Sequence, residues 1–327
     1  MRHPFHRRRI RILRWVIQLA AFGLLMYGGY GLNSLGLWDE GAQIEPSGGG
    51  GVKTVSKRPT ATNLSLPATT CIYQRQGLCK GCSLYFVSDA ITYRRPMDEV
   101  LPWILTLVVL MLVAGRLWCG WICPLGLISD LLTWLRNLVG LGEFRLSRGW
   151  RQGLVISKYG LLVAALGVAA AASFEPLADS RLSLVDPFCQ VCPSRIFAAF
   201  FTFDDVCWTV MHDPITITFT VLGLLAFALF FMGLAVRRLW CRLCPIGGIT
   251  ALFSRSGLAM LVKDSSRCTR CGTCRRVCPL DVERVYAGRG RGPVTSPECH
   301  LCLKCVEACP EPDCLQFAWL GFKVSGR

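Results

Sequence analysis

The sequence predicts an all-α transmembrane domain of four helices, arranged as two parallel pseudo-repeats, followed by a small C-terminal α+β domain. Three observations lead to this fold class. The chain of 327 residues is 52% hydrophobic and only 17% charged, which is too apolar for an ordinary soluble domain. It contains four long apolar runs. Its C-terminal part, by contrast, is basic and rich in cysteine.

Four segments are predicted to cross the membrane, because about 20 apolar residues in a helix span the hydrocarbon core. They are Trp15–Leu37, Val100–Leu117, Leu154–Phe174 and Ile215–Val236. The first is too long for a signal peptide and has no small-residue cleavage site, which favours a retained anchor. Lys158 lies near the start of the third segment, where we expect its long side chain to reach the interface.

The distribution of Lys and Arg predicts the orientation of these segments. The N-terminal tail has six Arg and no acid, and the part after Val236 has 15 Lys and Arg against seven acids. Segment 175–214 has only two Arg against six acids, and segment 38–99 is nearly balanced. We therefore expect a multi-pass protein of a bacterial inner membrane with both termini cytoplasmic. The net charge of +15 follows alternate loops, which argues against nucleic-acid binding.

The predicted organisation has five parts. A basic tail and the first helix occupy 1–37, and an outer loop occupies 38–99, in which 41–70 reads as a flexible linker rich in Gly, Ser, Thr and Pro. The other three helices occupy 100–262, a compact Cys-rich domain 263–314, and a C-terminal tail 315–327. Within the third part, segments 124–139 and 246–262 each follow a Cys-Pro pair, and we expect both to lie at the inner interface as short amphipathic helices.

The strongest chemical signal is a run of cysteines that occurs twice near the C-terminus. "CTRCGTCRRVCP" begins at Cys268 and "CHLCLKCVEACP" at Cys299, and both follow the spacing C-x2-C-x2-C-x3-C-P. This spacing is that of bacterial two-cluster ferredoxins, in which the fourth Cys ligates the other cluster. It predicts two [4Fe–4S] clusters, with ligands Cys268, Cys271, Cys274 and Cys309 for cluster 1 and Cys299, Cys302, Cys305 and Cys278 for cluster 2. Zinc and disulfides are the alternatives, but zinc sites favour paired C-x2-C knuckles and a cytoplasmic location disfavours disulfides.

A second repeat links the two halves of the membrane domain. "RLWCGWICPLG" begins at Arg116 and "RLWCRLCPIGG" at Arg238, each at the end of an apolar run. The Pro after each Cys pair suits the first turn of a helix, and a helix N-terminus stabilises thiolates. Three uses remain open for this inner set: an additional Fe–S cluster, a thiol/disulfide pair, or packing alone, with Trp118 and Trp240 as interface aromatics. The inner set comprises Cys119, Cys123, Cys241 and Cys244.

Cysteines also occur in both predicted outer loops. A set of four, Cys79, Cys82, Cys189 and Cys192, could converge at the outer face as a further cluster or as disulfides. Each half thus runs from outer Cys pair through a membrane helix to an inner Cys pair, which is the basis of the two parallel pseudo-repeats. Cys71, Cys207 and Cys314 have no assigned role, and Cys314 reads as a bystander thiol.

The four histidines, His3, His6, His212 and His300, all lie outside the predicted spans, so we expect no intrinsic haem. The chain also lacks a dinucleotide-binding or phosphate-binding glycine motif. No catalytic residue can be named, and whether the chain is itself an enzyme stays open.

From Val100 to Pro310, the apolar segments, the paired RLWC…CPxG motifs and the two-cluster run resemble the NapH/MauN-type membrane ferredoxins, which are related to the membrane part of NosR. The resemblance implies that Cys119, Cys123, Cys241 and Cys244 are the inner Cys-Pro pairs of that family. It also implies an electron-transfer subunit of the quinol-dehydrogenase type, which links the quinone pool to a periplasmic or membrane cytochrome or reductase and to a soluble ferredoxin-type subunit. The alternative is a redox assembly or maturation factor for a periplasmic metalloenzyme.

Overall fold

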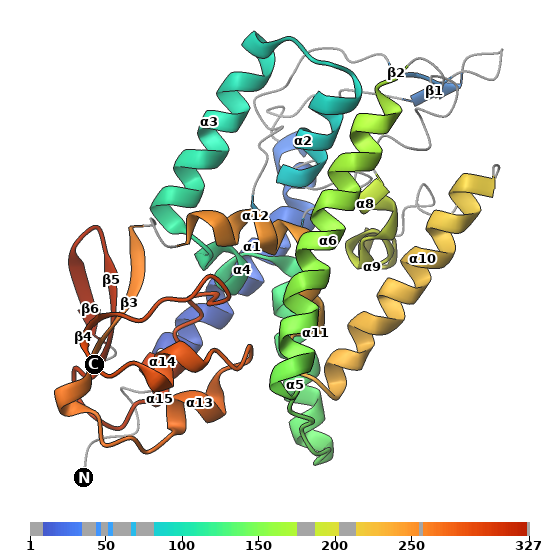
Figure 1. The fold of residues 1–327 in the computed structure, drawn as a ribbon. Helices are drawn as coiled ribbons and strands as arrows, with labels where there is room; N and C mark the ends of the chain where they lie inside the picture. Colours follow the sequence, from blue (N-terminus) through green and yellow to red (C-terminus); the bar gives the residue numbers. More distant parts are fainter. Residues whose placement is uncertain are drawn as a thin grey trace.

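The computed structural model describes residues 9–34, 44–46, 52–54, 67–69, 82–174, 187–202, 214–254 and 258–325. The described chain is mostly helical. Its longest helices are α1 (Arg9–Ser34), α3 (Met97–Ala114), α6 (Arg148–Ala172) and α10 (Pro214–Phe231). These four are tilted in a similar direction, and a small domain of short helices and strands lies at one end of them (Figure 1).

Three helices of the described chain are long and apolar enough to cross a membrane. The qualifying stretches are Arg9–Gly28, Arg148–Ala172 and Ile217–Leu234, and α3 contributes a shorter one, Val100–Ala114. At 1.5 Å per residue that stretch is about 22 Å long, whereas the hydrocarbon core is about 30 Å thick. The segment predicted to end at Leu117 stops earlier because Gly115, with φ of 56°, turns the chain out of α3.

The two RLWC segments fold alike. Each forms a one-turn helix followed by a helix that starts at the Pro after the second Cys: α4 (Leu117–Trp121) and α5 (Pro124–Val139) in the first, α11 (Leu239–Leu243) and α12 (Pro245–Phe253) in the second. The short 3-10 turn η4 (Met232–Leu234) extends α10 towards α11. The predicted segment 124–139 coincides with α5. The segment 246–262 is not one helix, because α12 ends at Phe253 and strand β3 begins at Ala259.

The segments predicted as outer loops contain short elements. These are α2 (Ser83–Thr92), α8 (Pro187–Val191), α9 (Pro193–Thr202) and the antiparallel pair β1 (Ile44–Pro46) and β2 (Val52–Thr54). Within the linker predicted at 41–70, the structure describes the β1–β2 pair. Pro67, Ala68 and Thr69, at the end of the same segment, are buried.

The C-terminal domain is built on a four-stranded antiparallel sheet with the strand order β4-β3-β5-β6. The strands are β3 (Ala259–Asp264), β4 (Arg291–Pro293), β5 (Leu315–Trp319) and β6 (Phe322–Ser325), and the helices are α13 (Thr273–Val277), α14 (Glu283–Ala287) and α15 (Lys304–Ala308), with the 3-10 turn η5 at Ser265–Arg267. Residues 315–325 are therefore not the separate tail predicted from the sequence. The apolar side chains of "LQFAW" bury one face against this domain while its backbone pairs with β3.

The C-terminal domain packs directly against the membrane helices. Its apolar core includes Trp121 from α4, and Ile10 and Ile17 from α1 pack against it. The Arg14 Nη1 donates to the Cys302 carbonyl at 3.0 Å, and the Gln18 Nε2 donates to the Gly120 carbonyl at 3.0 Å. The first half of α1 therefore holds this domain next to the RLWC segments.

Candidate metal centres

The four cysteines predicted to hold cluster 1 lie together in the C-terminal domain. Cys274 belongs to α13, and Cys309 follows α15. Burial raises the pKa of Cys274, and the charges of Cys309 and Cys268 raise it further. The charges of Cys271 and Cys268 act in the same way on the pKa of Cys309. The structure thus brings the last Cys of the second run to the first three of the first run.

The cysteines predicted for cluster 2 also come together. Burial raises the pKa of Cys305 well above its ordinary value, and the charges of Cys299, Cys302 and Cys278 add to this effect. These four sulfurs line one cavity, together with Cys274 from the neighbouring set. Because residues of both Cys sets line this cavity, the two sets of the C-terminal domain are adjacent.

The two cysteine runs reach these positions by the same backbone path. In the first run Arg270 and Gly272 have φ of 55° and 72°, and in the second Leu301 and Leu303 have φ of 48° and 56°. Left-handed residues on either side of the second Cys curl each run around a common centre. Such a curl allows three sulfurs of one run to face three corners of a cubane.

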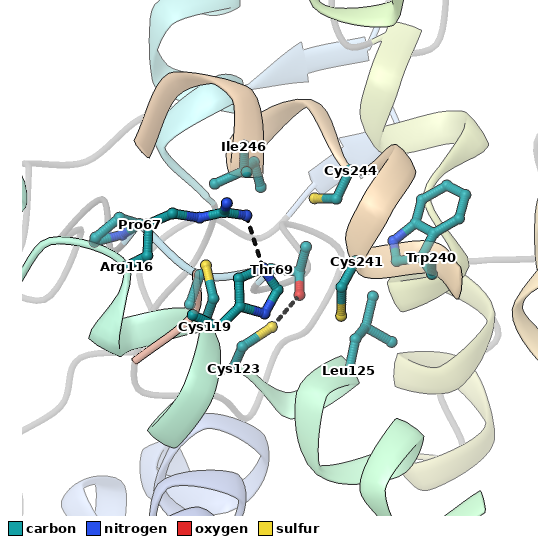
Figure 2. A pocket seen from close by; sticks show the side chains of 13 residues that line it. Pro67, Thr69, Arg116, Cys119, Cys123, Leu125, Trp240, Cys241, Cys244 and Ile246 are labelled. Atoms are coloured by element: carbon teal, nitrogen blue, oxygen red, sulfur yellow. Dashed lines mark hydrogen bonds between the residues drawn. The ribbon is translucent and has the colours of Figure 1, made fainter. Parts of the chain in front are cut away.

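The inner set converges on one cavity, which Figure 2 shows from close by. Cys119 comes from α4 and Cys241 from α11, whereas Cys123 and Cys244 are the N-cap residues of α5 and α12. The two N-caps have almost the same backbone, with φ and ψ of −61° and 123° for Cys123 and −59° and 120° for Cys244. The charges of Cys123, Cys119 and Cys241 all act on Cys244.

A segment expected at the outer face also lines this cavity. Pro67, Ala68 and Thr69 border it, and the Thr69 Oγ1 lies 2.9 Å from the Cys123 Sγ. Figure 2 shows Thr69 beside Cys123. The cavity therefore draws on both a predicted inner loop and a predicted outer segment, which sequence reasoning did not anticipate.

The chemistry around the inner set fits an anionic group that carries acceptor atoms. Burial raises the pKa of Cys241 to about 12 and raises that of Cys119, while Arg238 and Arg116 oppose the shift. Thiols in such a site are held as thiolates when a metal replaces their protons. Within the described residues, the indole Nε1 of Trp240 and the Nε of Arg116 are buried donors with no hydrogen-bond partner, and both residues line the cavity. The sulfides of an Fe–S cluster would accept from such donors.

No three His, Cys, Asp or Glu side chains among the described residues are gathered closely enough to share a single metal ion. A cubane is ligated at four separate corners, so its ligands do not need to meet at one point. The cysteines of each set lie near one another, because they line a common cavity or raise one another's pKa through their charges.

His300 lines both the inner cavity and the cluster 2 cavity. Its Nε2 lies 2.7 Å from the Arg116 Nη2, and its Nδ1 lies 3.4 Å from the Arg238 Nη1. Burial lowers the pKa of His300 well below its ordinary value, and the charges of Arg116 and Arg238 lower it further. Its Nε2 can accept from Arg116 when the imidazole is neutral.

The two RLWC arginines each connect the membrane domain to the C-terminal domain. Arg116 also donates to the Pro297 carbonyl and lies 3.7 Å from the Glu298 carboxylate. Arg238 donates to both carboxylate oxygens of Asp130, from Nε at 3.1 Å and Nη2 at 2.9 Å. Asp130 in turn accepts from the Lys304 Nζ at 3.0 Å. The sequence singled out the repeated arginines only as part of a motif, and their partners come from distant segments.

Close backbone approach also holds this boundary. The Trp121 Nε1 donates to the Leu301 carbonyl at 3.0 Å. A Cβ placed on Gly120 would collide with the His300 carbonyl oxygen and would lie 3.3 Å from the Cys302 Cα. The glycine between the cysteines of the first RLWC segment therefore lets the cluster 2 loop approach.

Each RLWC segment packs its arginine on the glycine of the other segment's CPxG turn. A Cβ on Gly247 would lie 3.0 Å from the Arg116 Nη2, and one on Gly126 would lie 3.9 Å from the Arg238 Nη2. The same two positions would meet the carbonyl of the first Cys of their own segment, at 3.7 Å for Cys241 and 2.9 Å for Cys119. The relation between the two segments is therefore reciprocal.

Only part of the predicted outer set can be placed. Cys79, like Cys71 and Cys207, lies outside the described residues. A hydrogen bond between the Cys82 and Cys189 thiols lowers the pKa of Cys82, and Cys192 is buried in the same apolar core as Cys82 and Cys244. Beside them, the buried hydroxyls of Ser83 and Ser194 have no hydrogen-bond partner in the described chain. These three cysteines therefore meet in a buried, partly polar environment.

Cys314, which the sequence left without a role, lies against the cysteines predicted for cluster 1. Its side chain is hydrogen-bonded to both Cys268 and Cys309, and it is only 1% exposed. Burial raises its pKa to about 12, so the thiol is a donor to these sulfurs. It is a neighbour of the predicted ligands rather than a member of either set.

Apolar membrane helices joined to a domain with two Cys runs define the class of membrane-bound iron–sulfur proteins. Comparisons with family models agree with this class. A "4Fe-4S binding domain" model matches residues 99–142 and 217–264, so that each match contains one RLWC segment, and a "4Fe-4S dicluster domain" model matches residues 260–310. No solved structure matches the chain.

The relatives include two ferredoxin-type proteins and one regulatory protein. The chain is 30% identical to the methylamine utilization ferredoxin-type protein MauN of Methylobacillus flagellatus over 51% of this chain and 50% of MauN. It is 28% identical to the regulatory protein NosR of Pseudomonas aeruginosa over 67% of this chain and 26% of NosR. It is 29% identical to the ferredoxin-type protein NapH of Escherichia coli over 66% of this chain and 67% of NapH. The chain is related to the NapH/MauN-type ferredoxins and to NosR, and its matches span half of MauN and about a quarter of NosR.

Proposed function

We propose that this protein is a membrane-bound iron–sulfur electron-transfer protein that carries electrons between the quinone pool and a partner redox protein, a periplasmic or membrane cytochrome or reductase. The observation that carries the proposal is the position of His300, which lines both the inner cavity and the cluster 2 cavity. Two Cys sets from different domains thus border the same buried residue. A carrier that moves electrons between a membrane and a soluble domain needs such a series of adjacent sites.

Two [4Fe–4S] clusters are assigned to the C-terminal domain, with the ligands Cys268, Cys271, Cys274 and Cys309, and Cys299, Cys302, Cys305 and Cys278. A third is assigned to Cys119, Cys123, Cys241 and Cys244. When bound, such clusters accept and donate single electrons. The protein's own residues supply the thiolates, the donors around them and a dry apolar wall. The outer set, Cys79, Cys82, Cys189 and Cys192, is assigned to a further cluster or to a disulfide.

The proposed topology has four membrane helices, α1, α3, α6 and α10, as two parallel pseudo-repeats with both termini in the cytoplasm of a bacterial inner membrane. The reciprocal packing of Arg116 on Gly247 and of Arg238 on Gly126 supports the repeat. Pro67–Thr69 then reaches the inner cavity from the outer side. Irregular backbone at membrane depth is tolerated where protein surrounds it, and these three residues are buried.

Iron and acid-labile sulfide per purified full-length chain test the number of clusters. About eight irons support the C-terminal clusters only, whereas about twelve or sixteen support one or two more. The double variant Cys119→Ala/Cys241→Ala should lose about four irons and one EPR signal relative to the unmodified chain. Gly153→Ala is the control, because it lies outside all four sets and a Cβ there meets no neighbouring atom within 4 Å. If the double variant retains its iron content, its EPR signals and its activity, the RLWC cysteines are structural.

Reduction of the purified protein by a quinol, followed by EPR, tests the electron-transfer role itself. The EPR signals of the reduced clusters should appear as fast as the protein turns over quinol. They should disappear when a quinone reoxidises the clusters. Similarity to MauN favours a second candidate, a redox assembly or maturation factor for a periplasmic metalloenzyme. That candidate predicts no steady quinol turnover, and it predicts that deletion of the gene leaves the target enzyme synthesised but lacking its mature cofactor.

A further inference from the structure

The turn between β5 and β6 exposes large apolar side chains. Trp319, Leu320 and Phe322 are 45%, 52% and 76% exposed, respectively, and the next residue, Lys323, is also exposed. Soluble domains rarely place such a contiguous apolar group at the tip of a hairpin, because it gains nothing from water.

The backbone conformation of this turn does not favour a leucine at position 320. Leu320 and Gly321 both have positive φ, at 50° and 82°. Two-residue turns with positive φ at both central positions strongly favour Asn-Gly or Asp-Gly. A leucine at the first position is strained by its Cβ. The turn favours Asn or Asp at this position, and an apolar side chain gains nothing from exposure to water. A contact outside the domain therefore explains the exposed leucine better.

The turn is fixed against the end of α3. The Trp319 Nε1 donates to the Val113 carbonyl at 3.0 Å, and the backbone N–H of Leu258 donates to the Leu112 carbonyl at 2.8 Å. The Leu320 N–H closes the group by donating to the Leu258 carbonyl at 3.2 Å. In Figure 1 the sheet carrying β3 and β5 lies just beyond this end of α3.

The exposed surface of α3 is also apolar. Leu105 and Val109 are each 55% exposed on the side of α3 away from the other elements. The apolar stretch of α3 is about 22 Å long, which leaves it short of the hydrocarbon thickness of about 30 Å. The β5–β6 turn is hydrogen-bonded to the C-terminal end of α3. Its apolar side chains would therefore lengthen the lipid-facing surface beyond that end of the helix.

We propose that the β5–β6 turn of the C-terminal domain inserts into the cytoplasmic leaflet, with Leu320 and Phe322 at the boundary of headgroups and acyl chains. Trp319 stands at the level where indoles gather in membranes, and Lys323 can reach the phosphates. The occupant of this surface is phospholipid. The inference rests on the proposed membrane crossing of α3, and it adds a second, monotopic attachment that fixes the C-terminal domain against the bilayer.

Site-specific photo-crosslinking in the full chain tests this proposal. Benzoylphenylalanine is placed at Phe322, and the protein is reconstituted in nanodiscs of phosphatidylcholine and phosphatidylglycerol. The matched control is Tyr286, an aromatic residue of the same domain that is 36% exposed and remote from α3. The positive control is Val109 on α3. We expect about tenfold more phospholipid adduct at 322 than at 286, as for an interfacial side chain.

The outcomes separate the proposal from the membrane topology on which it rests. Lipid adducts at 109 but not at 322 overturn the inference and leave the topology intact, whereas their absence at 109 overturns the topology. Adducts of 322 with a second copy of the chain or with a partner protein would also overturn the inference. The substitution Leu320→Asn suits the turn, so it should keep the domain folded, with its EPR signals unchanged, while lowering the adduct yield at 322. An unchanged yield in this variant would contradict the role of Leu320.

Discussion

The Nζ of Lys158 lies 2.6 Å from the Oε1 of Glu298, so a lysine inside α6 is neutralised by a carboxylate of the C-terminal domain. The lysine side chain has no exposed surface, whereas that of Glu298 is 27% exposed. We expected this lysine to reach water at the interface, but it reaches another part of the same chain.

Breaking this pair from one side should destabilise the protein. Glu298→Gln leaves the buried ammonium without its carboxylate, which costs about 3 kcal/mol, at the lower end of measured buried pairs because Glu298 is partly exposed. The double variant Lys158→Met/Glu298→Gln should recover most of that loss. Thermal unfolding in detergent, analysed as a double-mutant cycle, measures both. A double variant no more stable than Glu298→Gln would show that the pair is not coupled.

Gly120→Ala should loosen the C-terminal domain. The added methyl meets backbone atoms of His300 and Cys302, which cannot rotate away, so we expect a loss of about 1–3 kcal/mol. Hydrogen exchange should increase in the cluster 2 loop. The matched control is Gly153→Ala in α6, where a Cβ meets no neighbouring atom within 4 Å and a helical alanine is favourable. Equal exchange in the two variants would refute the packing role of Gly120.

Arg116→Lys should weaken the junction while leaving the iron content unchanged. A lysine lacks the planar fork that lets Arg116 contact His300 and Pro297 together. One charge-assisted hydrogen bond is lost, a cost of about 1.5–3 kcal/mol. Rapid-freeze EPR should show slower equilibration between the membrane and C-terminal centres. Arg291→Lys is the control, because the Arg291 side chain is 76% exposed in its pair with Asp264 and such pairs contribute little. Unchanged kinetics in Arg116→Lys would contradict a role for Arg116 at this boundary.

Cys271→Ser and Cys302→Ser should each abolish one [4Fe–4S] signal and leave the other at least partly intact, because the two residues belong to different ligand sets. The measurement is low-temperature EPR with iron analysis on the full chain. Gly153→Ala, at a position where a Cβ meets no neighbouring atom within 4 Å, is the control that retains both signals. Purified protein that contains zinc in place of iron, with no cluster signal after reconstitution, would refute the assignment.

The parts of the fold that local pattern determines could be predicted from the sequence. The two Cys runs have fixed spacing, so their curled backbones follow from a few residues, and the apolar runs locate the long helices. Val100–Leu117 was predicted too long because the left-handed Gly115 ends α3, and hydropathy does not register backbone conformation. Residues 315–325 were predicted as a tail because two strands as short as β5 and β6 have no strong signal of their own.

The contacts between distant segments could not be predicted. The approach of His300 to Arg116 and Arg238 depends on how a whole domain docks, and no spacing in the chain encodes it. The repeated arginine before each Trp-Cys was the available signal, because a charged residue at the end of two apolar runs implies a buried partner. Thr69 had no such signal, since it lies at the end of a stretch rich in Gly, Ser, Thr and Pro.

The position of His300 has a consequence for the order in which the protein is made. The inner cavity takes walls from α4, α5, α11 and α12, but its last wall is a residue of the C-terminal domain, which leaves the ribosome after all four helices. The cavity stays open on that side until the domain docks. Under the proposed assignment of a cluster to Cys119, Cys123, Cys241 and Cys244, delivery of iron and sulfide would be coupled to docking. A chain truncated before His300 would leave these thiols accessible to oxidants.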